Sequence, residues 1–72
     1  MVQIYKGRSY KTANDNIRIT IRAKIPLTEK YLVEFLTDNG SVWDMRWKQL
    51  ENREIKKLLN IPRNQKLMII TK

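Results

Sequence analysis

The chain has 72 residues, which corresponds to one small domain, so we treat residues 1–72 as a single basic domain. Fifteen Lys and Arg residues against seven Asp and Glu give a net charge of +8, which is typical of proteins that bind nucleic acid. A hydrophobic fraction of 42% excludes a disordered chain, and the lack of cysteine excludes disulfides and thiolate metal sites. No apolar stretch is long enough for a signal peptide or a membrane span. We therefore expect an intracellular, cytoplasmic protein that does not bind membranes.

The positive charge is concentrated near the N-terminus. Residues 1–24 contain six cations and one acid, Asp15, whereas the other 48 residues contain nine cations and six acids. Charge that only maintains solubility is the alternative interpretation, because small domains carry net charges of up to about eight for that reason. We favour a binding function for the cations of this region, which are Lys6, Arg8, Lys11, Arg18, Arg22 and Lys24.

Residues 17–25 are the clearest periodic segment of the chain. Ile and Ala at the odd positions alternate with Arg, Thr and Lys at the even positions, and this period of two predicts a half-buried strand. Residues 14–16 supply a turn before the strand, and Pro26 ends it.

Two further segments, residues 31–37 and 41–47, predict a hairpin around Gly40. A two-residue turn would place Phe35 opposite Asp44. We expect instead a three-residue loop with Gly40 in the left-handed conformation, because only this register puts one coherent apolar set on one face. The predicted pairs are Phe35 with Trp43, Val33 with Met45, Tyr31 with Trp47 and, as a like-charge pair that needs a nearby cation, Glu34 with Asp44.

The period then changes to i, i+3 and i+4, which predicts a helix over residues 52–59, with Asn52 as its N-cap and with Asn60 and Pro62 ending it. Residues 67–70 predict a final strand, and residues 2–4 a short first strand. The predicted fold class is α+β: a small antiparallel sheet of three to five strands, with one helix from the C-terminal half packed on its apolar face.

The residues for catalysis are few. Without His or Cys the commonest general base and the best nucleophile are both missing. Glu34 and Asp44, if paired, could hold a metal or act as acid and base, but we favour surface carboxylates neutralised by neighbouring Arg. The only glycines are Gly7 and Gly40, so no phosphate loop is present. We expect no enzyme activity, cofactor, metal site or small-molecule substrate.

The polar face of residues 17–25 is the best candidate site. Arg18, Arg22 and Lys24 would form a cationic row with Thr20 between them, because alternate residues of a strand lie about 6.8 Å apart on one face. Arg46 of the hairpin has the parity to join this row. Such a face suits phosphate contacts, and Arg can also bond guanine edges. A solvated strand face would show the same pattern, but the absence of acids within this strand favours binding.

The aromatic residues of the hairpin have two interpretations. We favour the hydrophobic core, because so small a chain has little else to bury. The alternative is a platform on which bases stack. Tyr5 and Tyr10, which alternate with basic residues, are better stacking candidates. The hairpin set consists of Tyr31, Phe35, Trp43 and Trp47.

Three antiparallel strands followed by a helix, with basic residues on the sheet, resemble the AP2-type DNA-binding module. The segments that carry the resemblance are residues 17–25, residues 31–35 with Gly40, and residues 52–59, about half of the chain. Small modules of this type occur in phage and mobile-element proteins, where Arg and Trp of the sheet dock into the major groove. The N-terminal segment and the final strand depart from the family, and no diagnostic motif is present. Size, charge and hairpins are also similar to the SH3-like barrels of archaeal chromatin proteins. For this chain the AP2 resemblance implicates Arg18, Arg22, Arg46 and Trp43.

These observations predict a small basic accessory protein that binds nucleic acid, DNA rather than RNA, through a cationic sheet face. The rival hypothesis is a protein-binding module, such as a phage-type inhibitor, that docks onto an acidic surface of a partner protein. The residues predicted to bind are Arg18, Arg22, Lys24, Arg46, Lys6, Arg8 and Lys11.

Overall fold

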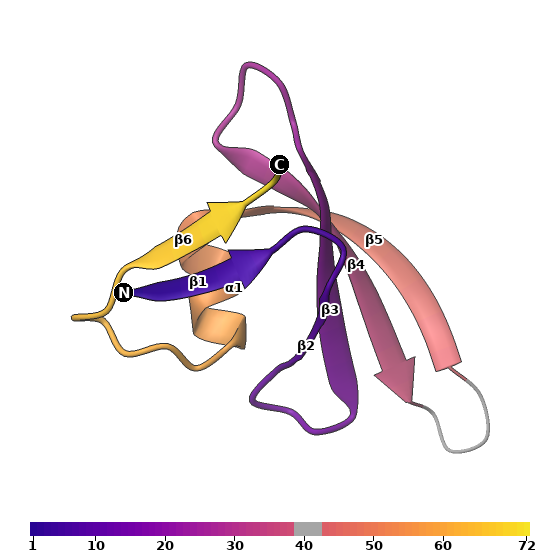
Figure 1. The fold of residues 1–72 in the computed structure, drawn as a ribbon. Coiled ribbons are helices and arrows are strands. Elements are labelled where there is room, and N and C mark those ends of the chain that lie inside the picture. Colours follow the sequence, from indigo (N-terminus) through magenta and orange to yellow (C-terminus); the bar gives the residue numbers. More distant parts are fainter. Residues whose placement is uncertain (39–42) are drawn as a thin grey trace.

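A computed structural model describes residues 1–38 and 43–72, and of Trp43 it describes the backbone alone. Four strands form an antiparallel sheet in chain order, and the first and last strands form a separate two-stranded parallel sheet. With one short helix they give a small α+β fold, which confirms the predicted class at this level (Figure 1). The elements are β1 Val2–Tyr5, β2 Ser9–Lys11, β3 Ile17–Lys24, β4 Lys30–Asp38, β5 Trp43–Glu51, α1 Asn52–Leu58 and β6 Leu67–Ile70.

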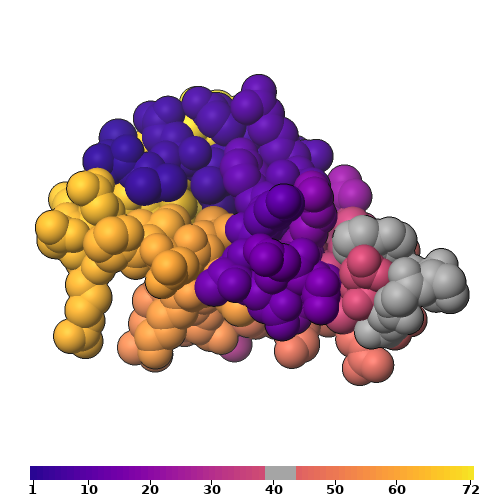
Figure 2. All heavy atoms as spheres, turned by 90° about the horizontal axis from the view of Figure 1, so that it is seen from below, coloured from indigo at the N-terminus to yellow at the C-terminus, as the bar shows by residue number. Residues whose placement is uncertain are grey.

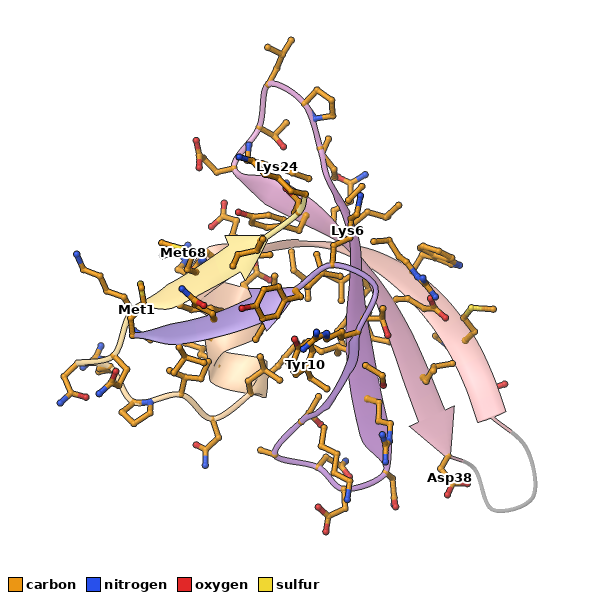
Figure 3. The ribbon with its side chains drawn as sticks, in the orientation of Figure 1. Met1, Lys6, Tyr10, Lys24, Asp38 and Met68 are labelled. Carbon is orange, nitrogen blue, oxygen red and sulfur yellow. The ribbon has the colours of Figure 1, made fainter. Side chains whose placement is uncertain are left out.

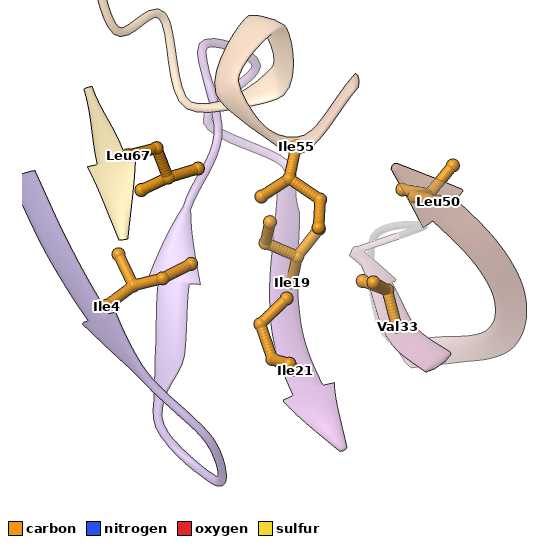
Figure 4. Packing of buried hydrophobic residues seen from close by; sticks show 7 residues of the cluster. All are labelled: Ile4, Ile19, Ile21, Val33, Leu50, Ile55 and Leu67. Atoms are coloured by element: carbon orange, nitrogen blue, oxygen red, sulfur yellow. The ribbon is translucent and has the colours of Figure 1, made fainter. Parts of the chain in front are cut away.

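The hydrophobic core is a cluster of buried side chains contributed by five strands and the helix (Figure 4). Ile19 and Ile21 of β3 have no exposed surface, as the alternation in this strand predicts. Ile55 of α1 and Val33 of β4 are also fully buried. Because β1 and β6 also supply core side chains, the core is complete only when these two strands are paired. The complete cluster is Ile4, Ile19, Ile21, Val33, Leu50, Ile55 and Leu67.

The N-cap of the helix lies one residue earlier than predicted, at Glu51 rather than at Asn52. The backbone N–H of Glu51 donates to the Glu54 carboxylate at 3.4 Å, one half of a capping box. The Asn52 side-chain amide instead donates to the Leu67 carbonyl at 3.0 Å and so connects α1 to β6. The helix ends at Leu58 with Leu59 as the C-cap, and Asn60 follows at φ 55°, the left-handed conformation that closes many helices.

The register of the β4–β5 hairpin differs from the predicted one. Phe35 lies opposite Arg46, not opposite Trp43, so β5 is displaced by three residues along β4. An odd displacement exchanges the two faces of β5. The like-charge pair of Glu34 and Asp44 is therefore wrong as well. The observed partners are Glu34 with Trp47, Val33 with Lys48, Leu36 with Met45 and Thr37 with Asp44.

This exchange moves predicted core residues to the surface. Trp47 is 51% exposed and Met45 is 55% exposed, so neither belongs to the core. Phe35 and Tyr31 are partly buried against the cluster, and Leu50 supplies the buried contribution of β5. Gly40 and the Trp43 side chain lie outside the described residues, so the predictions for them stay predictions.

The first and last strands lie side by side, an arrangement that the sequence did not predict. β1 and β6 pair in parallel, with Ile4 opposite Ile69, so the sheet system is not wholly antiparallel. Figure 2 shows the N-terminal and C-terminal segments adjoining at one end of the molecule. The three-residue strand β2 was also not predicted. Tyr10 of β2 accepts a hydrogen bond from the Tyr5 backbone N–H at 2.9 Å, which connects the two sheets.

Ile55→Ala is expected to lower the free energy of unfolding by about 2–5 kcal/mol, because it leaves a cavity in a fully buried site. Urea denaturation followed by circular dichroism measures this change. Met68→Ala is the matched control, since Met68 is 45% exposed and its loss should cost about 0.5 kcal/mol. Equal losses for the two variants would contradict the placement of Ile55 in the core.

Candidate nucleic-acid interface

The candidate interface is the face of the four-stranded sheet opposite the core, which we call the outer face. Directly paired residues of an antiparallel ladder point to the same side, so the register defines this face row by row. One row runs across all four strands through Ser9, Thr20, Glu34 and Trp47. The adjacent row consists of Lys11, Arg18, Leu36 and Met45.

The second row carries two cations side by side and no carboxylate. Lys11 of β2 lies directly opposite Arg18 of β3. Like charges in direct cross-strand positions destabilise a sheet unless an anion lies between or above them. The other two members of the row, Leu36 and Met45, are apolar. The row therefore presents a positive charge beside an apolar surface, an arrangement that suits a phosphate next to a sugar or a base.

Arg22 is held by a buried carboxylate. The register shifts between Ile21 and Ala23, so Arg22 is the additional residue of a β-bulge. Its Nε donates to Oε2 of Glu34 at 2.6 Å, and its Nη2 approaches the same oxygen at 2.6 Å. The Glu34 side chain is 7% exposed whereas that of Arg22 is 45% exposed. The ion pair satisfies a buried charge and leaves part of the guanidinium open to solvent.

Two of the predicted residues do not join Arg18. Beyond the bulge the parity of β3 is reversed, and Lys24 pairs with Tyr31 and donates from Nζ to the Thr28 carbonyl at 2.6 Å. Arg46 lies opposite Phe35 and so projects from the other face of the sheet. The predicted row of Arg18, Arg22, Lys24 and Arg46 is therefore wrong as a row, because a bulge and a register difference separate its members. Thr20, predicted within the row, is 4% exposed.

Two predicted cations of the N-terminal segment lie in a turn that contacts β3 beside the bulge. Lys6 and Arg8 lie in the turn between β1 and β2, and Gly7 in this turn donates its N–H to the Ile21 carbonyl at 2.9 Å. This hydrogen bond brings the turn to the residue that precedes Arg22. The Arg8 guanidinium lies over the Tyr5 ring, 4.7 Å from its centre. Tyr5 thus has a cation over one face of its ring and is 37% exposed, whereas Tyr10 is packed against the core.

The structure also shows a basic hollow that the sequence analysis missed. It has a volume of about 370 Å³ and lies between α1 and the segment that follows it. The spacing of Arg53, Lys56 and Lys57 already places them on one side of a helix, so the signal was present in the sequence. Lys56 donates from Nζ to the Arg63 carbonyl at 3.0 Å, which brings the following segment onto the helix. The lining residues are Arg53, Lys56, Lys57, Ile61 and Arg63.

Comparison with protein families, with curated proteins and with solved structures found no match. Within the described ranges, no helix is both long enough and apolar enough to cross a bilayer. Over the same ranges, no group of three or more acidic side chains is placed to hold a metal ion.

Arg22→Ala is expected to destabilise the protein by about 1–3 kcal/mol, because it leaves the Glu34 carboxylate buried without its partner. Thermal and urea denaturation measure the change. The double variant Arg22→Ala/Glu34→Gln should recover part of the loss, since a neutral amide is less costly to bury than a carboxylate. Lys11→Ala, an exposed cation of the same face, should stay within about 0.5 kcal/mol of the wild type. A larger loss for Lys11→Ala than for Arg22→Ala would contradict this assignment.

Proposed function

We propose that the protein binds double-stranded DNA through the outer face, with Lys11, Arg18 and Arg22 contacting phosphates. The observation that carries this proposal is the half-exposed Trp47, which lies one row from the Lys11–Arg18 pair. A large aromatic surface beside cations is what a groove needs, because it contacts sugars and thymine methyl groups while the cations hold the backbone. Lys6 and Arg8 of the neighbouring turn extend the basic surface.

The charge distribution supports a nucleic-acid partner. The chain carries a net charge of +8, and the outer-face row that contains Lys11 and Arg18 has no acid. Glu34, a buried acid of the face, is neutralised by Arg22. We favour DNA over RNA because a sheet or a β-ribbon fits the wide major groove of B-form DNA, whereas the major groove of A-form RNA is too narrow. The resemblance to AP2-type modules, in which Arg and Trp of a sheet dock into this groove, stays a prediction.

A second candidate function is the binding of an acidic surface on a partner protein. Exposed Trp47 and Met45 favour it, since Trp, Met and Arg are enriched in protein interfaces and Trp often dominates their affinity. The two functions use the same face and differ in the partner. Absence of binding to any nucleic acid at about 50 mM salt, where phosphate contacts are strong, would favour the protein partner.

Binding to a labelled DNA duplex is expected to weaken with salt, with a log–log slope of about −4 to −5 if four to six phosphates are neutralised. Fluorescence anisotropy at several salt concentrations measures this slope. Lys11→Ala and Arg18→Ala should each make it shallower by about 1, because each removes one phosphate contact. Lys66→Ala, an exposed cation next to β6, is the control and should leave the slope unchanged. A slope that responds equally to all three variants would show that the charge acts without a defined face.

Trp47→Ala is expected to weaken DNA binding by roughly 1–3 kcal/mol, the range found when an aromatic contact to nucleic acid is removed. The variant should stay folded, because Trp47 is 51% exposed. Its melting curve should remain close to that of the wild type, within about 1 kcal/mol. Trp47→Phe keeps an aromatic ring and should retain most of the affinity. Unfolding of Trp47→Ala, or unchanged binding by it, would remove Trp47 from the interface.

A further inference from the structure

The hairpin between β3 and β4 ends in a fully exposed leucine. Leu27 is 105% exposed, far more than any other large apolar residue in the described part of the chain. The loop that carries it extends beyond the rest of the fold at the top of Figure 1. No core residue needs Leu27, so a polar residue at this position would serve the free protein at least as well.

The backbone conformation of Leu27 is also unfavourable. Its φ is 65°, a left-handed conformation in which bulky side chains are outliers. Thr28 donates its N–H to the Ile25 carbonyl at 3.3 Å, which closes a turn with Pro26 and Leu27 at its centre. A proline followed by a positive φ has the features of a type II turn, which favours Gly or Asn where Leu27 stands.

The other positive-φ residues of the described chain show what this protein uses elsewhere. Gly7 has φ 87° in the turn between β1 and β2, and Asn60 has φ 55° after the helix. Both are residue types that adopt this conformation at little cost. Leu27 alone combines a strained backbone with a large side chain and full exposure. Strained residues of this kind cluster at functional sites.

The turn holds Leu27 rigidly. The Thr28 hydroxyl donates to the Ile25 carbonyl at 2.9 Å and accepts the Lys30 N–H at 3.1 Å. Lys24 donates from Nζ to the Thr28 carbonyl at 2.6 Å, and it lies at the base of this loop in Figure 3. A side chain presented by a fixed turn loses little conformational freedom on binding, which raises the affinity of an inserted group.

We propose that Leu27 is a wedge that inserts between two stacked base pairs of a duplex while the β3–β4 ribbon lies in the groove. The proposal rests on the DNA binding proposed above and adds that the duplex is bent. Proteins that kink DNA insert apolar side chains, Leu among them, between base steps and unstack them in part. Lys24 and Lys30 flank the tip and Arg22 lies further along the ribbon, so residues 22–30 carry three cations against one acid, Glu29. These cations would contact the phosphates on either side of the opened step.

The test uses a duplex of about 20 base pairs with dyes at both ends and 2-aminopurine beside a central TA step, a step that kinks easily. Wild-type protein should raise the 2-aminopurine fluorescence, which reports unstacking, and should increase energy transfer between the dyes. Leu27→Gly and Leu27→Asn should abolish both signals and keep the salt slope, because the phosphate contacts are intact. Leu27→Met keeps an apolar side chain and should retain both signals. Leu27→Gly and Leu27→Asn should melt at the same or a higher temperature, because both residues suit the turn.

The outcomes separate this inference from the proposed function. If the wild type binds the duplex without bending or unstacking it, the wedge is overturned and DNA binding stays in place. The same conclusion follows if Leu27→Gly retains both signals. Failure of the wild type to bind the duplex overturns both proposals. Binding of phosphatidylserine–phosphatidylcholine vesicles by the wild type, lost in Leu27→Gly, would assign the leucine to a membrane surface and overturn the wedge.

Discussion

The ion pair between Arg22 and Glu34 lies where β3, β4 and the turn between β1 and β2 meet. The bulge at Arg22 interrupts the β3–β4 ladder, and a bulge increases the local twist of a strand pair. The carbonyl of Ile21, the residue before the bulge, accepts the N–H of Gly7, so the turn between β1 and β2 is attached at the same place. The buried Glu34 carboxylate requires a cation here, and the bulge supplies it. The bulge at this contact separates the outer face from the part of the β3–β4 hairpin that projects beyond it.

This arrangement places the residues of the proposed interface on ordered strands. Lys11 and Arg18 are fixed by the ladder between β2 and β3, and Trp47 is fixed by the ladder between β4 and β5. The ribbon tip is fixed by its own hydrogen bonds. A surface whose backbone is already ordered does not need to become ordered on binding, so more of the contact energy is left for affinity. The small core and the exposed Trp47 are compatible, because the core uses Leu50 in its place.

The sequence predicts the elements of this fold better than their pairing. The alternation around Ile19 and Ile21 locates β3, and the change of period before Ile55 locates α1, because each pattern depends only on neighbouring residues. The register of β5 could not be predicted in the same way. The alternating pattern of β5 shows that Trp47 and Met45 lie on the same face of the sheet, but it does not show which face this is. The length of the connecting loop decides between the two faces.

Other features depend on contacts between distant segments. The alternation of residues 17–25 has no irregularity at Arg22, so the bulge leaves no trace in the pattern. The parallel pairing of β1 with β6 joins residues more than sixty positions apart, and neither strand shows it alone. Of the predicted site, Lys11, Arg18 and Arg22 share the outer face or its edge, and Lys6 and Arg8 lie in the turn attached beside Arg22. Lys24 and Arg46 are separated from them by the bulge and the register.

The parallel β1–β6 pair also sets an order of events during synthesis. β1 has a partner only after β6 has been made, and Leu67 of β6 completes the cluster around Ile4. The antiparallel strands between them can pair as they emerge, since their partners are close in sequence. Until β6 is made, β1 lacks its partner strand, although α1 already supplies Ile55 to the apolar face of β3. The N-terminal strand, although it is made first, is therefore the last strand to find its partner.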